Sequence, residues 1–197
     1  MNLLLPSLYL APIGFYSKIK DQQIIIEQHE FYEKQTYRNR CCIYGANGKL
    51  NLIVPITHEG EKKIMKDVKI NYDNPWQNIH WKSIQSAYRA SSYFEFYEDD
   101  FAPFYEKKEK FLYDFNQKLH ALILSMLEWE NKNEPSLQYE AMPKKAIDLR
   151  SSFTPKIITE EQPSEYRQVF NNKHGYIPNL SIVDLLFNMG PSSTTIL

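Results

Sequence analysis

The chain has few cysteines, and the two that it has cannot pair with each other. Cys41 and Cys42 are neighbours, and their Cα atoms, about 3.8 Å apart, are closer than ordinary disulfide geometry allows. They also lack the CxxC spacing and the third soft ligand of a zinc site. We therefore expect two free thiols, no metal site and a reducing, cytoplasmic environment.

Neither sign of charge is in excess. The chain has 23 Lys and Arg residues against 24 Asp and Glu residues, which leaves a formal net charge of −1. This balance excludes a general surface for binding nucleic acid or anionic membranes. It is compatible with a local cationic pocket. The apolar beginning, MNLLLPSLYLAPIGFY, lacks a basic leader and contains Pro6 and Pro12. We expect neither a signal peptide nor a membrane span there.

The glycines, 6 in all, form none of the glycine-rich motifs of nucleotide enzymes. The sequence has no P-loop, dinucleotide fingerprint, GxSxG nucleophile elbow or HExxH pair. P-loop ATP hydrolysis, covalent serine catalysis and zinc hydrolysis therefore have no support, and no cofactor is predicted. What the chain does contain is a hydrophobic fraction of 43% and an aromatic fraction of 14%. Such a composition excludes disorder and predicts a core that buries roughly 70% of the unfolded surface.

The first part of the chain predicts a β-α-β unit and then a hairpin. Residues 3–9 form a short apolar run, Pro12 suits the first turn of a helix, and residues 24–26 are a β-branched Ile-Ile-Ile run. Asn47 and Gly48 then separate two extended runs, and an Asn-Gly pair in that setting is a strong hairpin signal.

Periodic apolar residues predict helices in the middle of the chain. Trp76, His80, Ile84 and Tyr88 recur at intervals of four, so we expect His80 on the packed face of a helix. In residues 101–128 apolar residues recur at helical intervals throughout, which predicts one long amphipathic core helix. Its apolar stripe is also compatible with a homodimer interface.

The end of the chain predicts a last helix over residues 180–189, with Ser181 and Asp184 at capping-box spacing. Residues 68–72 alternate apolar and polar and predict a third strand beside the hairpin. Taken together, the patterns predict an α/β or α+β fold over residues 1–197. We expect a single domain with a mixed β-sheet, an N-terminal β-α-β-like unit, a β-hairpin and three to four packed helices.

The most polar stretch is residues 27–40, EQHEFYEKQTYRNR. If residues 34–40 are extended, their side chains alternate between two faces. The side chains that then share one face are Lys34, Thr36, Arg38 and Arg40. Such a row would bind phosphate or carboxylate, and His29 and Glu30 just upstream are candidate acid or base groups. The alternative is a solvated strand face balanced by the neighbouring glutamates.

Four segments resemble the WbqC-like protein family, and together they span nearly the whole chain. They are HEFYEKQTYRNR, WQNIHWKSIQSAYR followed by YFEFYEDD, DLRSSFTPK, and LSIVDLLFNMGP. The resemblance implies a place in bacterial surface-polysaccharide (O-antigen) biosynthesis, in which an amino acid such as glycine is transferred to a nucleotide-linked amino sugar. The residues that match the family pattern are Lys34, Asn39, Arg40, His80, Trp81 and Tyr88.

Three functions remain open at this point. In a transferase, Lys34, Arg38 and Arg40 would hold a diphosphate or an activated carboxylate, and Glu30 or His80 would deprotonate the attacking sugar amine. A non-catalytic binding module for an anionic sugar or nucleotide would use the same cations without a base. A protein-interaction domain would instead use the aromatic segment 93–104 against a partner.

Overall fold

The structure, a computed structural model, describes residues 2–57, 60, 62–130, 132–156 and 164–197. These residues form a mixed α/β fold with a parallel sheet, an antiparallel hairpin and six α-helices. The predicted fold class is confirmed, although the helices outnumber the three or four that the sequence patterns indicate.

The predicted β-α-β unit forms the centre of the parallel sheet. Strand β1 (Asn2–Pro6) pairs in parallel with β2 (Ile24–Glu27), and α1 (Ile13–Ile19) connects them. Residues 3–6 of β1 and 24–26 of β2 are unbroken apolar runs, as is typical of parallel strands that are covered on both faces. Two short parallel strands, β5 (Asn133–Pro135) and β6 (Ala146–Asp148), complete the order β5-β2-β1-β6.

The predicted hairpin is also confirmed. Strands β3 (Arg40–Gly45) and β4 (Gly48–Ile53) pair in antiparallel register, so that Ala46 and Asn47 form the two-residue turn. Gly48 closes the turn with a φ of 98°, in the left-handed region that favours glycine. Residues 68–72 do not add a strand to this hairpin, and that prediction is wrong. They make only isolated bridges, from Ile70 to Ile56 and from Lys69 to Phe111.

Most of the helical residues lie in three helices, α2 (Trp76–Tyr88), α3 (Phe94–Glu106) and α4 (Leu112–Met126). The prediction of one helix over residues 101–128 is wrong, because the chain leaves α3 and restarts as α4 after an extended Phe111. The apolar spacing continues through both helices, so it cannot reveal this break.

The chain ends with the short α5 (Asn171–His174), α6 (Ile182–Met189) and a 3₁₀ segment, Gly190–Thr195. The capping box expected at α6 is wrong. The Ser181 hydroxyl donates to the carbonyl of Leu10 at 2.8 Å instead of capping the helix. Asp184 is fully buried, where it accepts hydrogen bonds from Tyr88 and other core residues.

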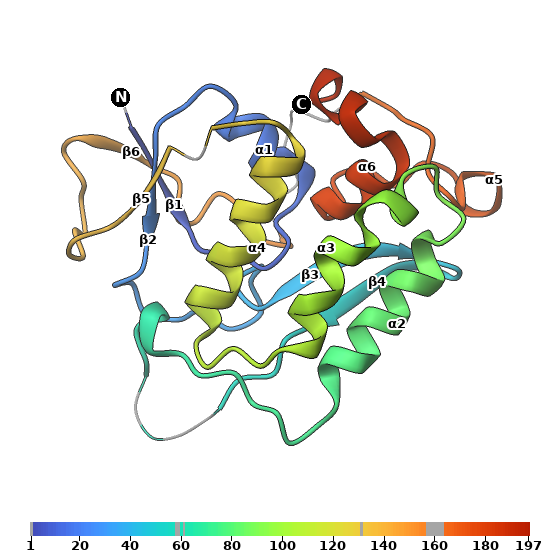
Figure 1. Cartoon of the computed structure of the whole chain (residues 1–197). Coiled ribbons are helices and arrows are strands. Elements are labelled where there is room, and N and C mark those ends of the chain that lie inside the picture. The colour runs from blue at the N-terminus through green and yellow to red at the C-terminus, as the bar shows by residue number, and fades with distance from the viewer. Residues whose placement is uncertain (1, 58–59, 61, 131, 157–163) are drawn as a thin grey trace.

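Figure 1 shows the parallel sheet on one side of the molecule and α2, α3 and α6 on the other, with α4 between them in this view. The main hydrophobic core joins residues of β1, β2, α1 and the hairpin to residues of α2, α3, α4 and α6. One continuous core across both sides supports a single domain. No helix in the described part of the chain is both long enough and apolar enough to cross a membrane.

Candidate functional site

The carboxyl ends of the parallel strands gather polar side chains at one edge of the sheet. Glu27 is the last residue of β2, Ser7 follows β1, Ser136 follows β5, and Arg150 lies just beyond β6. Open α/β sheets bind their ligands at this edge. We therefore place the candidate site here.

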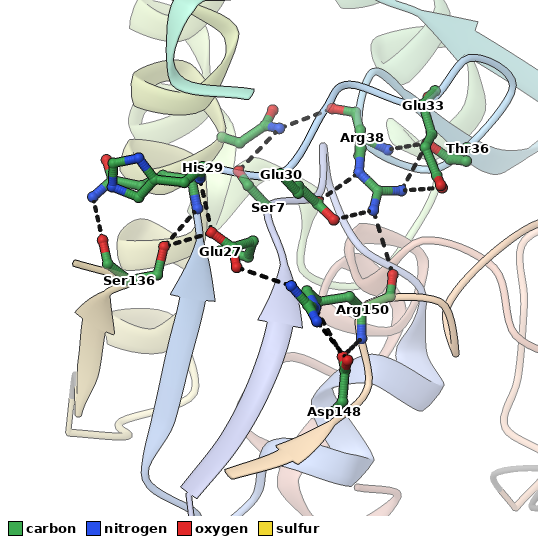
Figure 2. A network of polar contacts seen from close by, with 12 residues as sticks. Ser7, Glu27, His29, Glu30, Glu33, Thr36, Arg38, Ser136, Asp148 and Arg150 are labelled. Atoms are coloured by element: carbon green, nitrogen blue, oxygen red, sulfur yellow. Dashed lines mark hydrogen bonds and ion pairs between the residues drawn. The ribbon is translucent and has the colours of Figure 1, made fainter. Parts of the chain in front are cut away.

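Arg150 joins two of the strand ends. Its Nη1 donates to Glu27 Oε2 at 3.2 Å, and its Nε and Nη2 donate to the carboxylate of Asp148 at 2.9 and 2.6 Å (Figure 2). These hydrogen bonds lower the pKa of Asp148 below its usual range. Glu27 is fully buried and also accepts a hydrogen bond from the Ser136 hydroxyl at 2.6 Å. The ends of β2 and β6 are thus joined by an ionic network in which Arg150 and Glu27 are buried and Asp148 is exposed.

Arg38 is the second arginine of this network. It is only 1% exposed, and its Nε and Nη2 donate to the two carboxylate oxygens of Glu30, each at 2.8 Å (Figure 2). Its Nη1 donates to Glu33 and to Thr36 at 3.3 Å, and its Nη2 reaches the carbonyl of Arg150 at 3.4 Å. The two arginines therefore form one continuous network, and no part of the Arg38 fork faces solvent.

This geometry overturns the expectation of an extended segment over residues 34–40. The chain turns between residues 34 and 39, Gln35 has a φ of 61°, and strand β3 begins only at Arg40. Thr36 causes part of the turn, because its hydroxyl donates to the carbonyl of Glu33 at 2.8 Å. The four side chains at positions 34, 36, 38 and 40 consequently share no single face.

Glu30, a predicted acid or base, has both oxygens occupied by Arg38. Burial raises the pKa of its carboxyl, while the hydrogen bonds and the charge of Arg38 pull it down. The Glu30 carboxylate therefore holds Arg38 in place and does not reach a pocket. The neighbouring His29 donates its backbone N–H to Glu27 Oε1 at 2.8 Å and so belongs to the same network.

A pocket of about 820 Å³ lies against the outer side of this network. Glu33 and Thr36, which both contact Arg38, form part of its wall. Its charged lining otherwise consists of four lysines. These are Lys34, Lys62, Lys63 and Lys156. Within the described residues the pocket is therefore cationic, which suits a phosphate or carboxylate ligand.

A second pocket, of about 450 Å³, adjoins the first. Tyr32, Lys34, Gln35 and Ile56 line both pockets, so the turn at Gln35 separates them. The predicted residues Asn39 and Arg40 line the second pocket together with Lys34. The structure thus brings these three candidates together, whereas Arg38 lines neither pocket.

The other predicted residues lie elsewhere, on α2. His80 is buried among aromatic rings, its Nδ1 lies 3.0 Å from the Tyr9 hydroxyl, and burial lowers its pKa to about 4. Trp81 stacks on Tyr105 with ring centroids 5.4 Å apart. The hydroxyl of Tyr88 donates to Asp184 at 2.8 Å. None of the three lines either of the two pockets, and each packs in the core as a structural residue does.

Sequence reasoning gave no site role to Glu27, Asp148 or Arg150, although a signal was present. Glu27 comes directly after the Ile-Ile-Ile run, and a carboxylate at the end of a buried strand is typical of a site edge. The pocket lysines Lys62 and Lys63 gave no local signal, because paired surface lysines are common. Among the described residues no cluster of His, Cys, Asp and Glu has a metal-binding arrangement.

Comparisons with known proteins agree with the resemblance seen in the sequence. The sequence model of the WbqC-like protein family matches residues 7–157, a range that contains every residue named above in the two pockets. A relative from Mycobacterium tuberculosis, Uncharacterized protein Rv1507c, is 26% identical over 215 aligned residues, which cover 92% of this chain and 90% of the relative. No solved structure matches the chain.

Proposed function

Because this chain belongs to the WbqC-like protein family, we propose that it is a transferase of bacterial surface-polysaccharide (O-antigen) biosynthesis. Its substrate is a nucleotide-linked amino sugar, to which it attaches an amino acid such as glycine. The observation that carries the proposal is the lysine-lined pocket beside the buried arginine network at the carboxyl edge of the parallel sheet.

The cations have distinct roles in this proposal. Lys62, Lys63 and Lys156 bind the diphosphate. Their side chains are flexible, so each ammonium group can adjust its position to contact the phosphate oxygens of a bound ligand. Arg38 keeps the wall residues Glu33 and Thr36 in position and touches no ligand itself. The buried Arg38 is thus a positioning residue, and the exposed lysines are the binding residues.

The transfer forms an amide bond between the sugar amine and the activated carboxyl group of the amino acid. The bond to the activating group breaks, that group leaves with the electron pair, and the amine loses one proton. Glu30 and His80 have their hydrogen-bonding groups engaged inside the protein. Among the described residues, the carboxylates that line the pockets are Glu33 and Asp73, and these are the candidate proton acceptors.

A non-catalytic binding function is the second candidate. It is favoured because both carboxylate oxygens of Glu30 accept hydrogen bonds from Arg38. If neither pocket carboxylate accepts a proton from a substrate, the chain is a binding module for an anionic sugar or nucleotide. Such a module would bind the same ligands through the same lysines without turnover, so binding and turnover must be measured separately.

Calorimetric titration with UDP-, dTDP- and GDP-linked sugars tests the proposal. We expect one nucleotide class to bind and the double substitution Lys62→Met/Lys63→Met to weaken it about tenfold or more, since charge-assisted hydrogen bonds are lost. Lys49→Met, at an exposed position on β4 outside both pockets, is the matched control and should bind as the unchanged protein does. Equal binding by both variants would contradict a phosphate site in the first pocket.

A further inference from the structure

The two adjoining pockets differ in chemistry, and a ligand long enough to occupy both would have to match each. The first is lined by lysines. Among its described residues, the second contains side-chain amides and one carboxylate, Asp73, together with Lys34 and Arg40. Amide groups donate and accept hydrogen bonds as sugar hydroxyls do, whereas a carboxylate only accepts and attracts a cation.

Two residues of the second pocket's lining also hold buried side-chain atoms that have no hydrogen-bond partner among the described residues. They are Asn39 Oδ1 and Arg40 Nε. Asn39 is 5% exposed, and its Nδ2 already donates to the carbonyl of Val54 at 2.8 Å, which fixes the side chain. A buried oxygen without a donor is costly. Both atoms are closed off from solvent, so they belong to the rigid wall of the pocket and are not contacts for a ligand.

Asp73 stands at the mouth of the same pocket, in a fixed orientation. One of its oxygens, Oδ2, accepts a hydrogen bond from Asn71 Nδ2 at 2.9 Å, and its backbone N–H donates to Asn71 Oδ1 at 2.8 Å. Both side chains line the pocket. The pair thus presents a carboxylate held in place by its neighbour.

We propose that the second pocket is the subsite for the sugar ring of the ligand and that Asp73 selects rings that carry a protonated amine. This inference rests on the proposed function, because the diphosphate in the first pocket directs the ring across the turn at Gln35. The lining side-chain amides Gln35, Asn71 and Asn74 offer hydrogen-bond partners to the hydroxyl groups of the ring. Asp73 is then a specificity-determining residue, and it adds affinity only where the ring offers a cation.

Titrations with UDP, UDP-glucose and UDP-glucosamine test this assignment, because the two sugars differ by one amine in place of a hydroxyl. The unchanged protein should bind UDP-glucosamine about tenfold more tightly than UDP-glucose. Asp73→Asn should remove that preference and leave the affinity for UDP unchanged. Asp99→Asn, an exposed carboxylate of α3, is the matched control and should keep the preference. Asp73→Ser is a second variant that should behave as Asp73→Asn does.

Each outcome separates this inference from the function on which it rests. A preference that survives both Asp73 substitutions, or that is absent from the unchanged protein, overturns the role of Asp73. The phosphate site would still stand if UDP binding fell in the Lys62→Met/Lys63→Met variant. If dTDP or GDP binds in place of UDP, the same comparison is made with the glucose and glucosamine derivatives of that nucleotide. Failure of UDP, dTDP and GDP alike to bind would overturn both proposals together.

Discussion

Arg38 and Glu30 form a two-pronged ion pair in the interior, with Nε to Oε1 and Nη2 to Oε2 both at 2.8 Å. The residues are eight positions apart in the chain, and the turn between them brings Tyr32, Glu33, Lys34 and Gln35 to the pocket walls. A buried pair of this kind is costly to break because one charge stays behind without water. The pair therefore fixes the segment that lines both pockets.

The first prediction concerns the stability that this pair provides. Arg38→Met should lower the free energy of unfolding by about 3 to 5 kcal/mol, because Glu30 stays buried without its partner. Glu30→Gln should lower the free energy of unfolding much less in the Arg38→Met variant than in the unchanged protein. The reason is that the double variant leaves no buried charge in the pair. Urea unfolding of the two single variants and the double variant measures both effects.

A surface ion pair supplies the control for this experiment. Arg89 Nη2 lies 3.2 Å from Glu98 Oε1, but the Arg89 side chain is 68% exposed. Arg89→Met should therefore change stability by about 1 kcal/mol or less. Strictly additive effects of the Arg38 and Glu30 substitutions would contradict the pairing.

The second prediction concerns His80 and acid. Burial lowers its pKa to about 4, whereas an unfolded histidine titrates near 6.5. Between these values the unfolded chain binds more protons at this position than the folded chain does, so stability is lost as the pH falls. His80→Gln removes this contribution. The stability advantage of the unchanged protein over the variant should therefore shrink as the pH falls from about 7 to about 4.

Unfolding curves for both proteins across this pH range measure the effect, and other titrating groups cancel in the difference. One such group is His120, whose pKa burial also lowers to about 4. If the free energies of unfolding of the two proteins instead ran parallel across this pH range, His80 would titrate as an exposed histidine does, and the prediction would be contradicted.

The third prediction concerns Asp184 and has the opposite sign. Burial raises its pKa to about 6, although donors including Tyr88 and Tyr166 oppose the shift. The folded chain keeps this proton up to about pH 6, whereas the unfolded chain loses it near 4. Stability should therefore fall as the pH rises through this interval.

Asp184→Asn cannot titrate and isolates the contribution. The free energy of unfolding of the unchanged protein minus that of the variant should decrease from about pH 4 to about pH 7. A constant difference would place an ordinary carboxylate at this position. A rising difference would mean that the donors around Asp184 outweigh its burial.

Local patterns predicted those parts of the fold that local chemistry determines. The Ile-Ile-Ile strand, the Asn-Gly hairpin turn and the burial of His80 were all readable from neighbouring residues. The break between α3 and α4 could not be predicted from neighbouring residues. Between the two helices Phe111 forms a β-bridge with Lys69, which is distant in the sequence. Propensity yields to tertiary contacts at such points.

The candidate site was predictable only in part, for the same reason. The sequence singled out the cationic segment as the candidate site, and Lys34, Asn39 and Arg40 line one pocket of the structure. The burial of Arg38 depends on Glu30, and the ion pair of Arg150 with Glu27 joins residues 123 positions apart. The spacing of residues along a single strand reveals none of these partners. It therefore predicted an exposed arginine at position 38, where the structure has a buried arginine paired with Glu30.

The most direct test is a crystal structure of the protein with UDP-glucosamine at saturating concentration. The account predicts the diphosphate against Lys62 and Lys63 in the first pocket and the sugar amine within hydrogen-bond distance of Asp73 in the second. A nucleotide sugar bound beside His80 and Trp81, or at any other surface, would contradict the central claim that these two pockets form the substrate site.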